Sequence, residues 1–335
     1  MDFISLLPLI WAALIGVAVA FYVILDGFDL GIGMLFPFAR DDAERDRMLS
    51  AIAPFWDGNE TWLVLGGGGL LVAFPRAYAI IMPAFYLPIM VMLLALVFRG
   101  VTFEFRSIAQ RKRFWNFVFA AGSTVAGFCQ GLVLGGLVQG VTIKNGAFAG
   151  GAFDWATPFG VICGLGVVAG YALLGATWLM MKTDGDMARR AADKATLLLI
   201  AVLVFMAAVS IFTPLEFPRI AQRWFALPNL YYLLPVPIVT AVVALAEWYF
   251  IATRREAAPF LATIALFLLG YLGLVISTYP YIVPPDLTIR AAAAAPASQT
   301  FMLIGTLILL PIILSYTALT YWLFRGKVGA SAAYH

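Results

Sequence analysis

Carboxylic acids interrupt the apolar segments of this sequence at only a few places, and they are the side chains best suited to chemistry. Asp26 and Asp29 lie three residues apart in the run FYVILDGFDLGIGMLFPF, and Asp57 and Glu60 repeat that spacing in IAPFWDGNETWLV. Residues three apart share one face of a helix. Because burial and like-charge proximity both favour the protonated form of a carboxyl group, these pairs could take up and relay protons.

Each pair also has a structural interpretation. Asp26 and Asp29 could hydrogen-bond to unwound backbone or to Arg99. Intramembrane ionisable groups are functional by default, which favours the relay for this pair. For Asp57 and Glu60 the alternative is a polar helix entrance exposed to lipid headgroups, and the sequence does not separate the two interpretations.

Two single glutamates complete the set of candidates. Glu104 lies between Arg99 and Arg106, a spacing that slightly favours a local salt bridge. Glu247 lies seven residues before Arg254, and we expect its side chain to extend to the membrane interface.

The elements that must position these acids are membrane-spanning helices. Hydrophobic residues make up 63% of the 335 residues and charged residues only 12%, which excludes a water-soluble domain. No cleavable signal peptide is expected, because Asp2 stands where a basic n-region would lie. We expect an all-α integral membrane protein forming a single polytopic domain over residues 1–335. Taking ~20 apolar residues per crossing, nine spans are expected at 4–38, 49–74, 78–99, 114–141, 158–181, 195–213, 229–252, 258–283 and 300–324.

The second span needs a further condition. The apolar run from Trp62 to Phe74 is too short to cross a bilayer, so this span reaches membrane length only if IAPFWDGNE is also helical.

The basic residues indicate the orientation of the chain. Sixteen of the 21 Lys and Arg fall at one side of the expected spans. The positive-inside rule then predicts a periplasmic N-terminus and a cytoplasmic C-terminus. All six candidate carboxylates fall on the cytoplasmic side: Asp26, Asp29, Asp57, Glu60, Glu104 and Glu247. An acidic chain on that side could conduct protons inward.

The sequence gives little support for a metal or haem site in this chain. Its only histidine is His335, and Cys129 and Cys163 lie in expected spans without a ligand motif. We expect no metal site, no nucleic-acid partner and two buried, unpaired cysteines. Gly27, Gly31 and Gly33 should allow another helix to pack closely beside the Asp26 pair.

Four motifs carry a family resemblance. They are DGFDLGIGML at 26–35, IAPFWDGNETWLV at 52–64, FYLPIMVMLLALVFRGVTFEFR at 85–106 and LPIILSYTALTYW at 310–322. In this order and spacing the chain resembles subunit II of cytochrome bd ubiquinol oxidases, including the cyanide-insensitive type. The resemblance runs from the first span to the last.

The resemblance implies a fold, an activity and partners. The fold would be two four-helix bundles plus one peripheral helix, in a bacterial plasma (inner) membrane complex that oxidises quinol and reduces dioxygen to water. Haems b558, b595 and d, or b in place of d, would belong to partner subunit I. This chain would be a haem-free scaffold that supplies a cytoplasm-side proton path. A small accessory subunit, lipids and a structural ubiquinone are further ligands that the resemblance suggests.

The resemblance also assigns residues. Asp57 and Glu104 match positions of the family's proton path, and Asp26 and Asp29 match its first-span DGFD motif. Trp62 lies where some members have an oxygen-access route or a bound quinone.

Three features of the chain depart from the family pattern or match it weakly. Tyr334 is a distant match to a C-terminal tyrosine, and Glu247 has no counterpart. The outer loop between spans six and seven is compact, so contacts made there in longer relatives are not expected here.

Two other functions fit the residues alone. A proton-coupled secondary transporter also buries carboxylates beside glycine-broken helices. A structural assembly factor would tolerate neutralisation of the acids, whereas a proton path would not.

Overall fold

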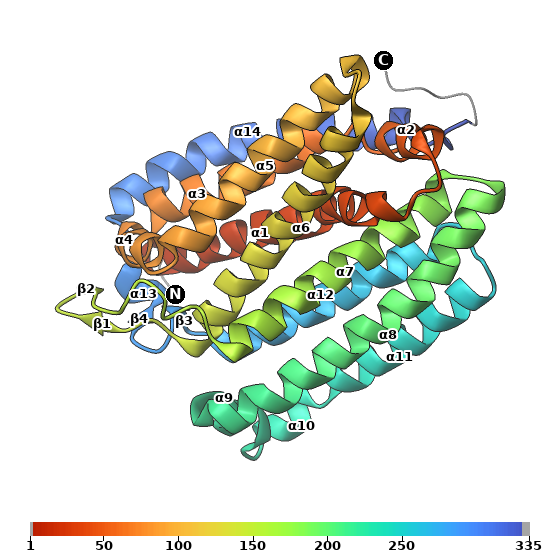
Figure 1. Cartoon of the computed structure of the whole chain (residues 1–335). Coiled ribbons are helices and arrows are strands. Elements are labelled where there is room, and N and C mark those ends of the chain that lie inside the picture. The colour runs from red at the N-terminus through yellow and green to blue at the C-terminus, as the bar shows by residue number, and fades with distance from the viewer. Residues whose placement is uncertain (1–2, 330–335) are drawn as a thin grey trace.

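The computed structural model describes residues 3–329, and most of these residues lie in helices that run nearly parallel to one another (Figure 1). The helices are α1 Phe3–Leu35, η1 Phe36–Phe38, α2 Asp42–Ser50, α3 Trp56–Ala73, α4 Pro75–Ala84, α5 Tyr86–Ile108, α6 Lys112–Gln139, α7 Pro158–Lys182, α8 Gly185–Glu216, α9 Pro218–Phe225, α10 Asn229–Leu233, α11 Pro235–Ala252, α12 Ala258–Thr278, α13 Ile289–Ala292 and α14 Pro296–Leu323.

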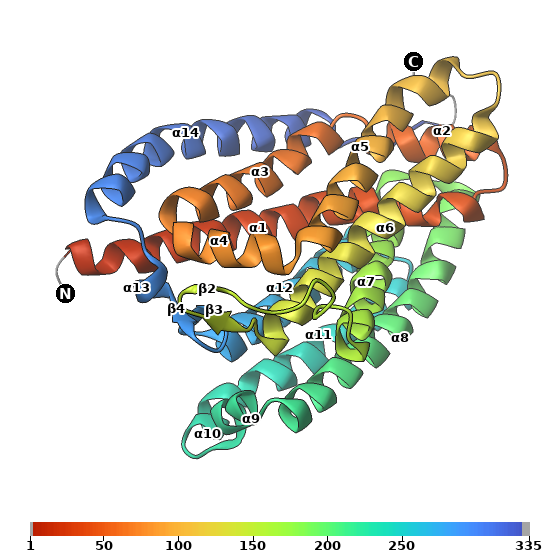
Figure 2. The same ribbon diagram turned by 60° about the vertical axis from the view of Figure 1, so that its left-hand side comes forward.

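Two short β-hairpins add to the expected all-helical fold. They pair β1 Ile143–Lys144 with β2 Ala147–Phe148, and β3 Tyr281–Val283 with β4 Leu287–Thr288, both antiparallel. Both hairpins lie at the end of the molecule where α1 begins, and α2 and the end of α14 lie at the opposite end (Figures 1 and 2). We call these the hairpin end and the α2 end.

Eight helical segments within residues 3–329 are long and apolar enough to cross a membrane. They are Phe3–Phe38, Tyr86–Ile108, Lys112–Gln139, Pro158–Lys182, Gly185–Glu216, Asn229–Ala252, Ala258–Thr278 and Pro296–Leu323. The expected count of nine is therefore not confirmed. The segment that falls short is α3, whose first turns carry Asp57, Asn59 and Glu60. Nevertheless α3 lies lengthwise against α1 and α14 (Figure 2).

Three expected boundaries were wrong. Residues 51–55 form turns and α3 begins at Trp56, so only the later part of IAPFWDGNE is helical. The third span is divided into α4 and α5, which continues to Ile108 and so includes Glu104. The eighth span ends at Thr278, just before Pro280, whose ring lacks the N–H that a helix needs.

The helices pack in two neighbouring groups. The first contains α1, α3, α5 and α6, and the second contains α7, α8, α11 and α12. Helix α14 contacts only α1 and α3 extensively and is largely exposed. Because α1 packs against α7 as closely as against α3, the groups share one continuous core, and their description as two separate bundles stays a prediction.

Small residues make the contact between α1 and α7 possible. A methyl group built on Gly31 would lie 1.8 Å from the carbonyl oxygen of Tyr171, and one on Gly175 would lie 2.5 Å from the carbonyl carbon of Gly31. The expectation that glycines beside Asp26 admit a second backbone is confirmed. This crossing fixes the height of α1, and therefore of its two aspartates, relative to the second group.

Candidate functional site

Arg99 is the centre of a buried polar cluster in the half of the molecule nearer the α2 end. Its Nη1 donates to Asp26 Oδ1 at 2.7 Å and to Glu60 Oε1 at 2.9 Å, and its Nη2 lies 3.9 Å from Asp29 Oδ2. The side chains of Arg99, Asp26 and Asp29 are completely buried. Helices α1, α3 and α5 thus converge on one guanidinium group. We call this group and the three carboxylates around it the Arg99 cluster.

Two residues outside the candidate set extend the cluster to α14. Asn59 Nδ2 donates to Asp29 Oδ2 at 2.7 Å and to the Leu25 carbonyl at 3.1 Å. The Tyr321 hydroxyl donates to Asn59 Oδ1 at 3.0 Å. Sequence reasoning did not assign either residue a role, although Asn59 lies in the same motif as Asp57 and Glu60. Asn59 directly precedes Glu60 in the sequence, and this adjacency does not show that the Asn59 side chain faces α1.

The charges of the Arg99 cluster do not balance. Arg99 carries one positive charge, whereas Asp26, Asp29 and Glu60 would carry three negative charges if all were ionised. An uncompensated charge is costly inside a membrane protein. If all three carboxyl groups were ionised, the cluster would carry a net charge of two negative units inside the helix bundle.

Glu60 connects the Arg99 cluster with the outside of the chain. Its side chain is 28% exposed, in contrast to the fully buried aspartates that share Arg99 with it. Asp57 lies three residues earlier on α3 and is exposed. The two residues of the second pair therefore occupy different environments: Asp57 lies at the surface and Glu60 between the surface and the buried arginine.

Glu104 lies on the exposed face of α5, away from its neighbouring arginines. Arg99 pairs with the cluster described above, and Arg106 pairs with Asp42 and Asp46 of α2. Within residues 3–329 no ion pair involves Glu104. The expected local salt bridge is therefore wrong, because the two arginines turn to the opposite side of α5.

Glu247 is not at the membrane interface. Its side chain is fully buried, and its Oε1 lies 2.6 Å from Thr263 Oγ1 of α12, within hydrogen-bond distance. The expectation of an extended, interfacial side chain is wrong because Glu247 faces α12, while the neighbouring Trp248 is exposed. This site belongs to the second group of helices, apart from the Arg99 cluster.

Trp62 is buried and its ring stacks on Phe21 with centroids 4.6 Å apart. An apolar cavity of about 30 Å³ lies beside it between α1, α3 and α14. This volume is far below the roughly 300 Å³ at which ligand pockets begin. The cavity is too small for a quinone ring. Tyr334, the remaining candidate, lies outside the described residues.

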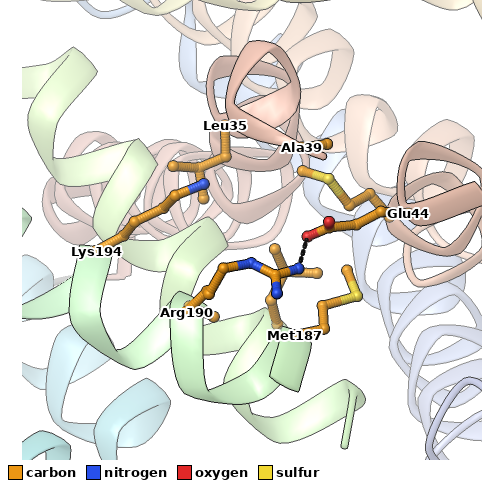
Figure 3. A pocket seen from close by; sticks show the side chains of 9 residues that line it. Leu35, Ala39, Glu44, Met187, Arg190 and Lys194 are labelled. Atoms are coloured by element: carbon orange, nitrogen blue, oxygen red, sulfur yellow. Dashed lines mark ion pairs between the residues drawn. The ribbon is translucent and has the colours of Figure 1, made fainter. Parts of the chain in front are cut away.

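Helix α2 connects the two groups of helices through ion pairs. Arg190 Nη2 of α8 lies 2.7 Å from Glu44 Oε1, and Asp46 pairs with Arg106 of α5. Figure 3 shows the Glu44–Arg190 ion pair with Lys194 nearby. These residues line a cavity of about 10 Å³ that holds at most one water. Burial alone would raise the pKa of Glu44, but hydrogen bonds from Arg190 and from the Arg40 N–H outweigh it and lower that pKa.

Comparisons with known proteins agree with this architecture. The family model of cytochrome bd terminal oxidase subunit II matches residues 7–324. Subunit 2 of the Escherichia coli K12 cytochrome bd-I ubiquinol oxidase is 31% identical over 372 aligned positions, covering 97% of this chain and 96% of that one. Subunit 2 of the Bacillus subtilis cytochrome bd ubiquinol oxidase is 28% identical, covering 95% and 96%.

A solved structure shows the same fold. A chain of the bd oxidase from Geobacillus thermodenitrificans superposes with a TM-score of 0.75 at 17% identity, over 95% of this chain and 98% of that chain. The sequence alignments cover almost the whole length of this chain and of each relative. The chain therefore belongs to the cytochrome bd terminal oxidase subunit II family and is a multi-pass protein of the bacterial plasma membrane.

Proposed function

We propose that this chain is the haem-free subunit II of a quinol:oxygen oxidoreductase, where it scaffolds a haem-bearing subunit I and supplies protons for the reduction of dioxygen to water. The named activities of its relatives support the reaction. The unbalanced Arg99 cluster supports the proton path. The family match gives no support to a transporter.

The observation that carries the proton path is the position of Glu60. Asp57 at the surface would take up a proton and pass it to Glu60, one turn further along α3. Glu60 shares Arg99 Nη1 with Asp26, so a proton reaching Glu60 changes the charge that the buried pair experiences. In this proposed path Asp57 is the entrance for protons, and Glu60 connects it to the buried pair. Asp26 and Asp29 are the proton-binding residues in the interior.

The surface that carries Asp57 and Glu104 is the face we propose for subunit I. Both acids lie among exposed apolar side chains of α3 and α5, which include Val64, Val97, Phe98 and Val101. An ionised carboxylate facing lipid at this depth would be costly. Contact with a partner protein removes that cost by supplying hydrogen-bond donors, and it brings both acids to the chain that holds the haems.

The orientation and the number of crossings complete the proposal. We assign the α2 end, where basic residues are concentrated, to the cytoplasm. Helix α3 would then be the ninth crossing, supported by its position along α1 and α14 and shielded on its polar side by Arg99. The haems, b558, b595 and d or b, are assigned to subunit I. A small accessory subunit, and entry of dioxygen rather than quinone beside Trp62, are finer parts of the same proposal.

The test combines composition with turnover. The complex purified through this chain should contain a larger chain and show reduced-haem absorption. Asp57→Asn and Glu104→Gln should each slow quinol-driven oxygen consumption per haem while haem content stays near wild type. A fall in activity only in step with haem loss would make these residues structural, and wild-type turnover would remove them from the path.

A further inference from the structure

Glu247 is a buried carboxylic group that the proposed proton path does not use. It lies near the end of α11, with its side chain fully buried between helices of the second group. Phe28, Trp178 and Phe260 pack against one another where α1, α7 and α12 meet, with ring centroids 4.1 to 5.8 Å apart. No hydrogen bond among residues 3–329 connects Glu247 with the Arg99 cluster.

The polar partner of Glu247 is Thr263 of α12, which in turn lies close to Thr177 of α7. Thr263 Oγ1 of α12 lies 2.6 Å from Glu247 Oε1, 3.0 Å from the Pro259 carbonyl and 3.2 Å from Thr177 Oγ1 of α7. Thr177 Oγ1 also donates to the Leu173 carbonyl at 2.9 Å. Glu247 Oε2 has no hydrogen-bond partner among the described residues.

No cation compensates Glu247 in the described part of the chain. The basic residues of the packed helices are engaged elsewhere: Lys182 of α7 binds the carbonyl groups of Phe324 and Gly326, and Arg254, which follows α11, pairs with Asp193 of α8. Of the other charged groups on α8, Arg190 pairs with Glu44 and Lys194 binds the Phe38 carbonyl. An ionised Glu247 would therefore be a buried charge with one hydrogen bond, an arrangement that proteins avoid by neutralising the group.

The count of hydrogens is consistent with a neutral Glu247. The 2.6 Å distance fits donation in either direction, so it does not decide which oxygen carries the hydrogen. If Glu247 donates to Thr263 Oγ1, Thr263 keeps its own hydrogen for the Pro259 carbonyl. The only polar atom then left unpaired is Oε2, a neutral carbonyl oxygen rather than half of an anion.

We propose that Glu247 is a proton-binding site, with a proton held on the carboxyl group and donated to Thr263 Oγ1. The bound proton joins α11 to α12 through the Glu247–Thr263 hydrogen bond. This site is separate from the Arg99 cluster, and its proton stays in place during turnover. Its role is to hold the α2 end of the second group together without a charge.

Infrared spectroscopy of the purified two-subunit complex tests the protonation directly. In the wild-type minus Glu247→Gln difference spectrum at neutral pH we expect the carbonyl stretch of a protonated carboxylic acid, shifted to lower frequency in D2O. Glu216→Gln is the matched control, because Glu216 is exposed at the end of α8 and its removal should delete only carboxylate bands. Loss of carboxylate bands in Glu247→Gln would overturn the proposal.

A second variant covers the case in which Glu247→Gln does not assemble. Thr263→Val retains Glu247 but removes the one hydrogen-bond partner that it has among the described residues, so the carboxylic carbonyl band should move to higher frequency. An unchanged spectrum would contradict the proposed hydrogen bond.

Sodium is the alternative ligand for this group of oxygen atoms. The thermal midpoint of the wild-type complex should be the same in sodium and choline salts at equal ionic strength. A sodium-dependent rise that disappears in Glu247→Gln or Thr263→Val would assign the site to a metal cation instead.

Discussion

The carboxylate of Glu60 lies 2.9 Å from the Nη1 atom of Arg99, and the two side chains differ in exposure, 28% for Glu60 and none for Arg99. This contact joins a partly exposed carboxyl group to a cation that is completely enclosed. Since Arg99 also binds Asp26, a change of charge on Glu60 alters the balance of the whole cluster. The proposed proton path depends on this relationship.

Arg99 should be essential for stability as well as for proton transfer. Arg99→Gln leaves two buried aspartates uncompensated, and removing one partner of a buried ion pair costs about 3–5 kcal/mol. We expect poor assembly and a strongly lowered thermal midpoint of the complex. Arg290→Gln, at an exposed position, should change stability by less than about 0.5 kcal/mol.

A double variant separates charge from packing at Arg99. If Arg99 acts mainly by neutralising carboxylates, Asp26→Asn should restore part of the stability lost in Arg99→Gln. If the stability losses of the two single variants simply add in the double variant, Arg99 stabilises the fold through packing and not by neutralising Asp26.

The α1–α7 crossing should not tolerate a single methyl group. Gly31→Ala places a Cβ atom 1.8 Å from the Tyr171 carbonyl oxygen, so α1 must move and the free energy of unfolding should fall by about 1–3 kcal/mol or more. Because this shift displaces Asp26 and Asp29, oxygen consumption per haem should fall too. Gly67→Ala is the control, since no atom lies within 4 Å of its added methyl group. It should gain roughly 0.5–1 kcal/mol in helix stability.

The Glu44–Arg190 pair predicts a pH-dependent stability. The folded-state pKa of Glu44 lies below its ordinary value of 4.5. The pair therefore stabilises the fold above that pH, and its contribution is lost as the pH falls through the folded-state pKa. Glu44→Gln should cost about 1.5–3 kcal/mol at neutral pH, and the difference in thermal midpoint from wild type should vanish in acid.

The exposed pair between Glu256 and Lys327 provides the comparison. Glu256→Gln should cost about 0–1 kcal/mol at most. A wild-type to Glu44→Gln difference that is constant from neutral to acidic pH would show that the pair contributes through packing and not through charge.

The sequence predicted which helices carry the acids but not how each helix is rotated. The spacing of Asp26 and Asp29 placed both on one face, and both do contact the same arginine. The same argument grouped Asp57 with Glu60, yet only Glu60 reaches Arg99. The identity of the buried residue depends on how α3 packs against α1 and α5, a long-range property that local spacing does not contain.

The errors at Glu104 and Glu247 have the same origin. Neighbouring arginines in the sequence suggested a salt bridge for Glu104 and an interfacial position for Glu247. In the fold those arginines pair with α1, α2 and α8, because partners far apart in sequence compete successfully for them. The short second span, in contrast, was recognisable from the polar residues at the start of α3.

The most direct test of the central claim is quinol-driven oxygen consumption per haem in Glu60→Gln, measured on the complex with subunit I beside Glu60→Asp. Replacing the carboxyl group by an amide keeps a hydrogen-bond acceptor for Arg99 but removes the ability to carry a proton. We predict a fall of about tenfold or more with full haem content, and partial activity in Glu60→Asp. Wild-type turnover in a fully haem-loaded Glu60→Gln complex would contradict the proposed connection between the surface and the Arg99 cluster.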